Sequence, residues 1–154
     1  MSMLDYMEIL KTFNNNGIHY IIVGSIAVNL YGIPRITYDI DILLYLDETN
    51  TKRFVEQMIQ MDFKPKIPVK PMDIIDVNKR SDCIKNKSMK AFCFANPDWA
   101  ISKIDIIIDS PINYEEAITR AKFVTINGIK LPIISIDDLI TMKKVSMRDK
   151  DIVI

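Results

Sequence analysis

The sequence contains few of the residues that build zinc sites and disulfide frameworks. Its 154 residues include two cysteines and one histidine. Cys83 and Cys93 show no CxxC spacing and have no histidine cluster nearby, so neither a zinc site nor a disulfide framework is indicated. We expect both to be free thiols. His19 has no partner pattern for metal binding, and we assign it no role.

Long apolar runs and an excess of charge of either sign are also absent. No apolar run approaches the ~20 residues of a membrane span, and the first residues, MSMLDYMEILK, include acids where a signal peptide carries positive charge. Lysine plus arginine equals aspartate plus glutamate, 20 against 20, so no net field attracts the chain to nucleic acid or membranes. We expect a cytoplasmic protein without membrane contact. A lysine-rich stretch over 64–90 is either a substrate groove or a solvated face.

Apolar residues are plentiful, at 49% of the chain, which suffices for one core; residues 1–154 are therefore predicted to form a single domain. The sequence contains both strand-like and helix-like segments, and we expect an α/β (α+β) fold. Helices are expected over 5–14, 26–31, 47–62 (capped by Thr49 or Asn50), 113–122 and from 135 onward. Strands are expected over 20–23, 38–44, 102–109 and in a hairpin over 123–134, with short candidates at 74–77 and 91–94.

The chemistry is concentrated in the stretch from Val23 to Leu44, VGSIAVNLYGIPRITYDIDILL. An apolar strand ends abruptly at Gly24 and Ser25, where small residues let the backbone come close to a ligand. The helix-like segment that follows stops at Gly32, a residue suited to the left-handed position after a helix end. The unit is therefore a strand, a tight turn and a helix.

Asp39 and Asp41 lie two residues apart in the next strand, so their side chains point to the same face. Two carboxylates there repel each other and lose hydration if buried, unless a cation or hydrogen-bond donors compensate. Magnesium accepts carboxylate oxygens and shares its other positions between water and substrate phosphates, which favours a phosphoryl- or nucleotidyl-transfer site. The alternative is a half-exposed strand whose polar face is simply solvated.

A third carboxylate is expected on the strand over 102–109. Asp105 lies in its middle among isoleucines, a costly place for an unpaired charge, and Asp109 shares its face. Periodicity therefore leaves both Asp105 and Asp109 as candidates for the third carboxylate. We prefer Asp105, because Asp109 precedes Ser110-Pro111 and has the sequence context of a strand end.

The spacing of Gly24-Ser25, thirteen further residues and Asp39-Ile40-Asp41 resembles the signature of the nucleotidyltransferase fold superfamily. Two segments, YGIPRITYDID and LITMKKVSMRDKDIVI, resemble more narrowly the AbiEii-like branch, whose members include toxin components of bacterial toxin–antitoxin systems. The resemblance implies a mixed β-sheet flanked by helices, with the third acid on a later strand.

The resemblance also implies the site residues. Asp39, Asp41 and Asp105 would be catalytic and hold two Mg²⁺ ions, with Mn²⁺ as an alternative. The nucleotide would be bound by Gly24, Ser25, Arg35, Thr37 and Lys143. From its position alone, Arg35 is a surface charge, an ion-pair partner that holds the strand or a contact to substrate phosphate, and without the resemblance Lys143 is an ordinary solvated helix charge. A P-loop does not hold the phosphates, because the sequence contains no GxxxxGK[ST].

The leading hypothesis is a metal-dependent nucleotidyltransferase that moves a nucleoside monophosphate from an NTP to an acceptor hydroxyl and releases pyrophosphate. The acceptor is RNA, a protein or a small molecule. The first alternative is a non-catalytic binding or regulatory component of a toxin–antitoxin pair, with a cognate partner. The second is a structural or metal-binding α/β domain.

Overall fold

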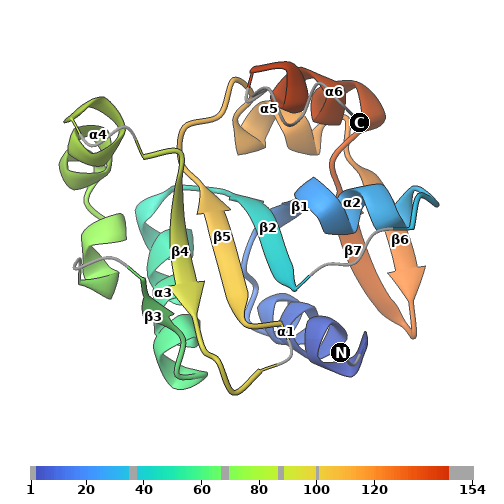
Figure 1. Ribbon diagram of the computed structural model, residues 1–154, viewed down its shortest axis with the longest axis horizontal. Helices are drawn as coiled ribbons and strands as arrows, with labels where there is room; N and C mark the ends of the chain where they lie inside the picture. The colour runs from blue at the N-terminus through green and yellow to red at the C-terminus, as the bar shows by residue number, and fades with distance from the viewer. Residues whose placement is uncertain (1–2, 35–37, 67–69, 87–88, 100, 146–154) are drawn as a thin grey trace.

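The computed structural model describes residues 3–34, 38–66, 70–86, 89–99 and 101–145 (Figure 1). The strands are β1 (Tyr20–Val23), β2 (Asp39–Leu44), β3 (Lys64–Pro65), β4 (Ala91–Ala95), β5 (Lys103–Ile107), β6 (Lys122–Ile126) and β7 (Ile129–Ile133). The helices are α1 (Met3–Asn15), α2 (Gly24–Leu30), α3 (Glu48–Gln60), the 3₁₀ turn η1 (Pro71–Ile74), α4 (Val77–Asn86), α5 (Tyr114–Ile118) and α6 (Ile136–Val145).

The strands form one mixed sheet in the order β3-β4-β5-β2-β1-β7-β6. The pairs β2–β5 and β1–β7 are parallel, and the other neighbouring pairs are antiparallel. This arrangement confirms the expected α/β class with a mixed sheet flanked by helices. It also places β2, the strand of the paired acids, beside β5 at the centre of the sheet.

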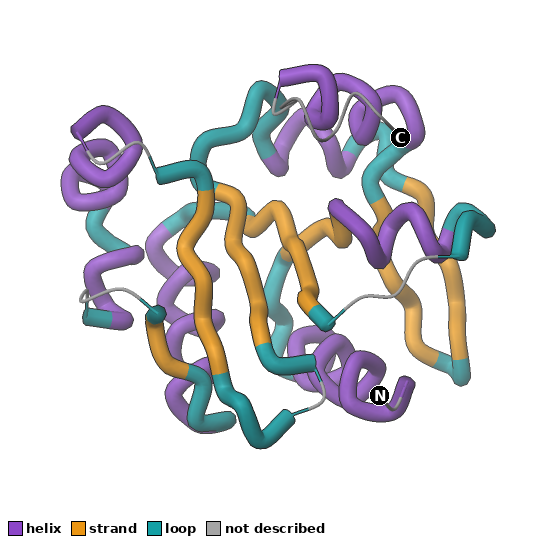
Figure 2. The backbone as a smooth tube through the Cα atoms, viewed as in Figure 1, coloured by secondary structure: helices purple, strands orange, loops and turns teal. Residues whose placement is uncertain are grey.

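One face of the sheet is covered by α1 and α3 (Figure 2). Phe13 of α1 contacts Tyr20 of β1, with ring centroids 5.4 Å apart, and Phe54 of α3 stacks on Phe94 of β4 at 5.7 Å. Along β4 and β5, buried residues alternate with half-buried ones, so their opposite face is partly open. The burial of the apolar face leaves the acid-bearing face available for chemistry.

Helix α2 begins directly after β1, at Gly24. Gly24 begins the helix in a left-handed conformation, with φ +68°, and Val23 gives the first turn no side-chain cap. After the last turn, the Tyr31 hydroxyl donates a hydrogen bond of 2.7 Å to the carbonyl of Ile134. This bond ties the C-terminal end of α2 to the residue that follows β7.

Two local predictions were wrong. The segment over 74–77 is not a strand: it joins η1 to α4, because Pro71 starts a 3₁₀ turn and the Asp76 carboxylate accepts a 2.8 Å hydrogen bond from the backbone N–H of Asn78. Helix α3 is capped by Asp47, not by Thr49 or Asn50. Asn50 is buried, and its amide instead bonds the backbone of His19 and Tyr45.

The other predicted elements are present with shifted ends. The hairpin turns at Asn127 and Gly128, with β6 and β7 paired from Lys122↔Ile133 to Ile126↔Ile129. The helix expected over 113–122 is shorter, because β6 already begins at Lys122; its Asn113 cap is present and accepts from the N–H of Glu116 at 2.8 Å. None of the helices in the described residues has the length and apolar character needed to span a bilayer.

Candidate active site

Three side chains line up across the open face of the sheet. Asp41 of β2 is in register with Asp105 of β5, and Asp105 is in register with Cys93 of β4. Directly opposite residues on neighbouring strands have Cβ atoms about 4.5–5.5 Å apart. Asp39 lies two residues before Asp41 on the same face and is opposite Lys103. We call Asp39, Asp41 and Asp105 the acid cluster.

Gly24 abuts this cluster from the β1 side. A Cβ atom built on Gly24 would lie 2.1 Å from Oδ2 of Asp41 and 2.9 Å from its Cγ. Only glycine fits this approach, because the backbone is left-handed and the carboxylate fills the space where a side chain would stand. The turn after β1 is therefore in direct contact with the acid-bearing strand.

The carboxylates of Asp41 and Asp105 are hydrogen-bonded to each other. Burial is the largest cause that raises the pKa of Asp41 from 3.8 to about 7; the charge and hydrogen bond of Asp105 and the charge of Asp39 contribute to the same shift. Burial and Asp105 also raise the pKa of Asp39, while Lys103 and Lys66 oppose that shift. In the absence of a cation, Asp41 therefore releases its proton only near neutral pH.

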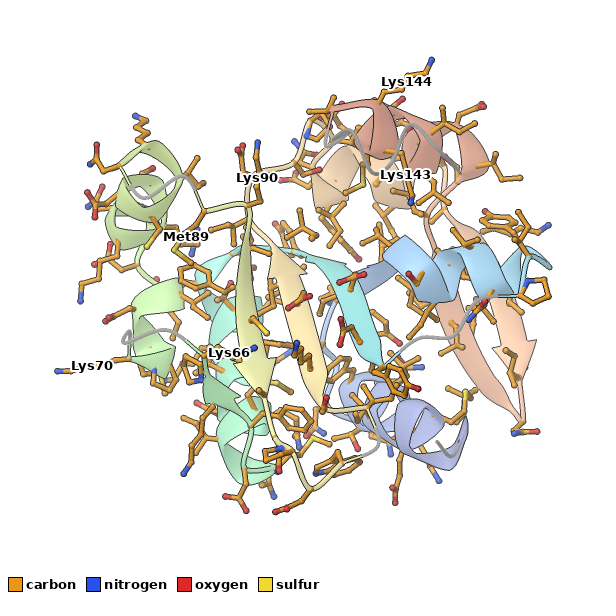
Figure 3. The ribbon with its side chains drawn as sticks, viewed as in Figure 1. Lys66, Lys70, Met89, Lys90, Lys143 and Lys144 are labelled. Carbon is orange, nitrogen blue, oxygen red and sulfur yellow. The ribbon has the colours of Figure 1, made fainter. Side chains whose placement is uncertain are left out.

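Basic side chains approach the cluster from two sides (Figure 3). Lys143 of α6 is half-buried and lowers the pKa of Asp41, which places its charge near that carboxylate. Lys66, whose backbone N–H donates to the Cys93 carbonyl at 3.0 Å, approaches across β4. Lys70 and Lys144 point away from the open face (Figure 3).

The structure distinguishes the two candidates for the third acid. Asp105 is half-buried in register with Asp41, whereas Asp109 lies beyond the end of β5 and is exposed. The Oδ2 of Asp109 forms an ion pair with Nζ of Lys90 at 3.3 Å. The period-two pattern of a strand put Asp105 and Asp109 on one face, but only Asp105 is in register with Asp41.

The other residues predicted to bind the nucleotide are Ser25, Arg35 and Thr37. Ser25 is half-buried in the first turn of α2, next to Gly24. Arg35 and Thr37 lie outside the described residues, so their predicted contacts to the nucleotide stay predictions.

Sequence reasoning missed two residues at the cluster, Cys93 and Lys103, whereas Lys66 belongs to the lysine-rich stretch for which a substrate groove was one of two alternatives. Cys93 is a free thiol, as expected, but burial and its hydrogen bond to Asp105 raise its pKa to about 12, so it stays protonated. The alternation of β4 could have placed Cys93 on the half-exposed face. Nothing local in the sequence indicated that β4 pairs with β5.

The donor set suits magnesium. Within the described part of the chain, no group of three or more His, Cys, Asp or Glu side chains is arranged to hold a metal ion by itself. Magnesium rarely uses such all-protein cages; it binds one or two carboxylates and takes its other oxygens from water and phosphates. Asp41 and Asp105, two adjacent carboxylates, fit this requirement, and a cation would displace the proton that the raised pKa of Asp41 retains.

The raised pKa of Asp41 predicts how the stability of the metal-free protein depends on pH. Between pH 3.8 and about 7, the Asp41 carboxyl keeps a proton in the folded state that it has already released in the unfolded chain. The stabilising contribution of this proton is therefore complete below pH ~3.8 and lost as pH rises through 7. We expect the unfolding temperature in EDTA to fall between pH 5 and 8, and the Asp41→Asn variant to lose much of that slope. A slope that is equally steep in the variant would contradict the assignment.

Comparisons with known proteins bear on the fold. No protein-family model and no curated protein matches the sequence. Among solved structures, the chain is similar to LnuA, a lincosamide antibiotic adenylyltransferase with lincomycin bound: TM-score 0.64, 15% identity, 99% of this chain and 93% of that one covered. It is also similar to a proposed nucleotidyltransferase from Thermotoga maritima: TM-score 0.57, 16% identity, with 94% and 87% covered.

The class is therefore a protein with the nucleotidyltransferase fold. At such low identity the likeness shows the fold alone. The narrower AbiEii-like resemblance stays a prediction.

Proposed function

We propose that the protein is a metal-dependent nucleotidyltransferase that transfers a nucleoside monophosphate from an NTP to an acceptor hydroxyl. The observation that carries the proposal is the register of Asp41 with Asp105 beside the close approach of Gly24. Like charges paired on a half-buried sheet face weaken a fold unless a ligand neutralises them. The nucleotidyltransferase folds of the structural neighbours support the same reaction class.

Each residue has a role that follows from its place. Asp39 and Asp41 would hold magnesium against the triphosphate, and Asp105 would hold a second ion on the acceptor side. Magnesium would neutralise phosphate charge and lower the pKa of the acceptor hydroxyl. The N–H groups at Gly24 and Ser25, with the Ser25 hydroxyl, would donate to the β- and γ-phosphates.

The reaction is a single displacement at the α-phosphorus. The acceptor oxygen forms a bond to this phosphorus while the bond to the β-phosphate bridging oxygen breaks, and pyrophosphate leaves. The acceptor gives up its hydroxyl proton, which Asp105 is placed to receive. Lys143, close to Asp41, is positioned to stabilise the charge of the leaving pyrophosphate. The protein thus contributes positioning and charge rather than a covalent intermediate.

The finer parts of this proposal rest on resemblance. LnuA acts on a lincosamide antibiotic, which supports a small-molecule acceptor; RNA and protein acceptors remain alternatives. Membership of the AbiEii-like branch, with a toxin–antitoxin partner and a cytoplasmic location, rests on the two sequence segments quoted above.

Thermal unfolding with ligands tests the proposal. Magnesium and ATP together should raise the unfolding temperature by more than the sum of their separate effects, because a ligand that binds only the folded state stabilises it by mass action. Additive or absent shifts across ATP, GTP, CTP and UTP would contradict it. A screen of labelled NTPs against tRNA, cell extract and aminoglycosides then identifies the acceptor.

The third carboxylate gives a matched pair of variants. We expect Asp105→Asn to remove most of the transfer rate while leaving NTP affinity within about threefold, because Asp105 lies on the acceptor side. Asp109→Asn should change neither, since that exposed side chain lies beyond the end of β5 and forms an ion pair with Lys90. Separate measurements of turnover and of NTP affinity test the choice of Asp105 over Asp109. An inactive Asp109→Asn with an active Asp105→Asn would overturn the choice.

A further inference from the structure

A hollow of about 290 Å³ lies where β2 and β5 end. Leu43 and Ile107 supply apolar lining, and Tyr45 and Tyr114 supply aromatic lining, with their rings stacked at a centroid distance of 5.2 Å. Asn113 is among the polar residues at the hollow. Its volume is near the lower limit of small-molecule pockets, so it suits a compact group rather than a macromolecule.

The hollow continues the candidate active site along the same sheet face. Leu43 follows Asp41 by two residues, Ile107 follows Asp105 by two residues, and Leu43 and Ile107 are themselves in register. Two residues along a strand correspond to about 6.5 Å. A molecule in the hollow would therefore lie one register step from the acid cluster.

In-line displacement at the α-phosphorus limits which part of the two substrates can lie in the hollow. The leaving pyrophosphate would be on the side of Gly24, Ser25 and Lys143, and an in-line acceptor must approach from the opposite side, across Asp105 and Cys93. The nucleoside attached to the same phosphorus then has to extend along the strands rather than across them.

The two directions along the strands differ in chemistry. Toward the beginnings of β2 and β5, the row on this face consists of the charged pair Asp39 and Lys103. Toward their ends, it consists of Leu43 and Ile107, followed by the two tyrosines. Nucleobases have flat apolar faces that pack on aliphatic and aromatic side chains.

We propose that this hollow binds the nucleoside part of the NTP, with the base against Leu43 and Ile107 beside the Tyr45–Tyr114 stack. The proposal rests on the proposed function, because it takes the triphosphate to lie at Gly24 and the acid cluster. It adds a binding site made by the ends of β2 and β5 and the start of α5.

Filling the hollow separates nucleoside binding from triphosphate binding. The variant is Ile107→Trp, and the matched control is Ala91→Trp, which places the same side chain in the same row on β4, outside the lining of the hollow. The probes are magnesium tripolyphosphate, which has no nucleoside, and the magnesium complexes of ATP, GTP, CTP and UTP. Tyr114→Ala is the second variant, should Ile107→Trp not fold.

We expect wild type to bind its preferred NTP about tenfold or more tighter than tripolyphosphate. Stacking of a base on an aromatic side chain strengthens binding by about this factor in other nucleotide-binding sites. Ile107→Trp should lose most of that advantage and keep tripolyphosphate affinity within about twofold, and Tyr114→Ala should weaken only the NTP. Ala91→Trp should change neither affinity.

Two results would overturn the proposal while leaving the triphosphate site intact. One is equal wild-type affinity for tripolyphosphate and every NTP. The other is unchanged NTP affinity in folded Ile107→Trp, which would assign the hollow to the acceptor instead. A wild type that binds neither probe would contradict the proposed function itself, and a parallel loss of both probes in Ile107→Trp would also exclude a nucleoside-specific site.

Discussion

Replacing Asp41 by asparagine is expected to abolish nucleotidyl transfer and, at the same time, to stabilise the metal-free protein. Losing outer-shell partners of a metal already costs about 10–100-fold in metal affinity or activity, so losing a carboxylate proposed to bind the metal directly should cost more than a hundredfold. The gain in stability follows from the raised pKa of Asp41. Burial, Asp105 and Asp39 disfavour the charged form of this carboxylate, and asparagine carries no charge. Its amide can still donate to Asp105.

Unfolding in EDTA at pH 8 measures the second effect. The unfolding temperature of Asp41→Asn should exceed that of wild type by about 3 °C or more, given that each kcal/mol shifts this temperature by about 2–4 °C in a chain of this size. Asp109→Asn is the control, because its carboxylate is exposed and paired with Lys90. The assignment fails if Asp41→Asn retains near wild-type turnover with magnesium, or if it is less stable than wild type without metal.

Replacing Gly24 by alanine should be nearly as damaging, for a different reason. The new Cβ would lie 2.1 Å from Oδ2 of Asp41, so the carboxylate or the turn must move. In the proposed mechanism, the positions of magnesium and of the phosphates depend on both the carboxylate and the turn. We expect transfer to fall by about a hundredfold or more, as for ångström-scale misplacement of reacting groups, and Gly24→Val to be worse still.

Gly17 provides the matched control for Gly24. It has nearly the same left-handed backbone, φ +65° against +68°, but a Cβ there would meet its nearest neighbour, Nη1 of Arg53, at an ordinary 3.5 Å. Both alanine variants should lose about 1–2 kcal/mol from the strained backbone. Only Gly24→Ala should lose transfer and NTP affinity. Equal activity in the two variants would show that the turn does not position the acid cluster.

The sequence predicted what depends on local periodicity. Period-two alternation placed Asp39 and Asp41 on one face, and the structure has them there, because a strand fixes side-chain direction irrespective of its neighbours. The preference for Asp105 rested on its isoleucine neighbours, which are fully buried on the other face. In both cases the cost of a buried charge was readable from the residues alone.

Strand order and the environment of the site were not predictable in this way. Cys93 lies beside Asp105 only because β4 pairs antiparallel with β5, a contact that depends on packing of the whole sheet. The hollow at Leu43 and Ile107 needs α5 to stand beside the ends of two strands. The segment over 74–77 has strand-like composition, but the neighbouring proline and aspartates favoured helical turns.

The most direct test of the account is the fate of isotopic label in the NTP. The central claim is that the bond between the α- and β-phosphates breaks and that the α-phosphate stays with the acceptor. With magnesium and a cell extract as the source of acceptors, NTP labelled in the α-phosphate should transfer label to an acceptor, and NTP labelled in the γ-phosphate should yield labelled pyrophosphate only. Transfer of the γ-label, or α-label transfer by Asp41→Asn at the wild-type rate, would contradict the account.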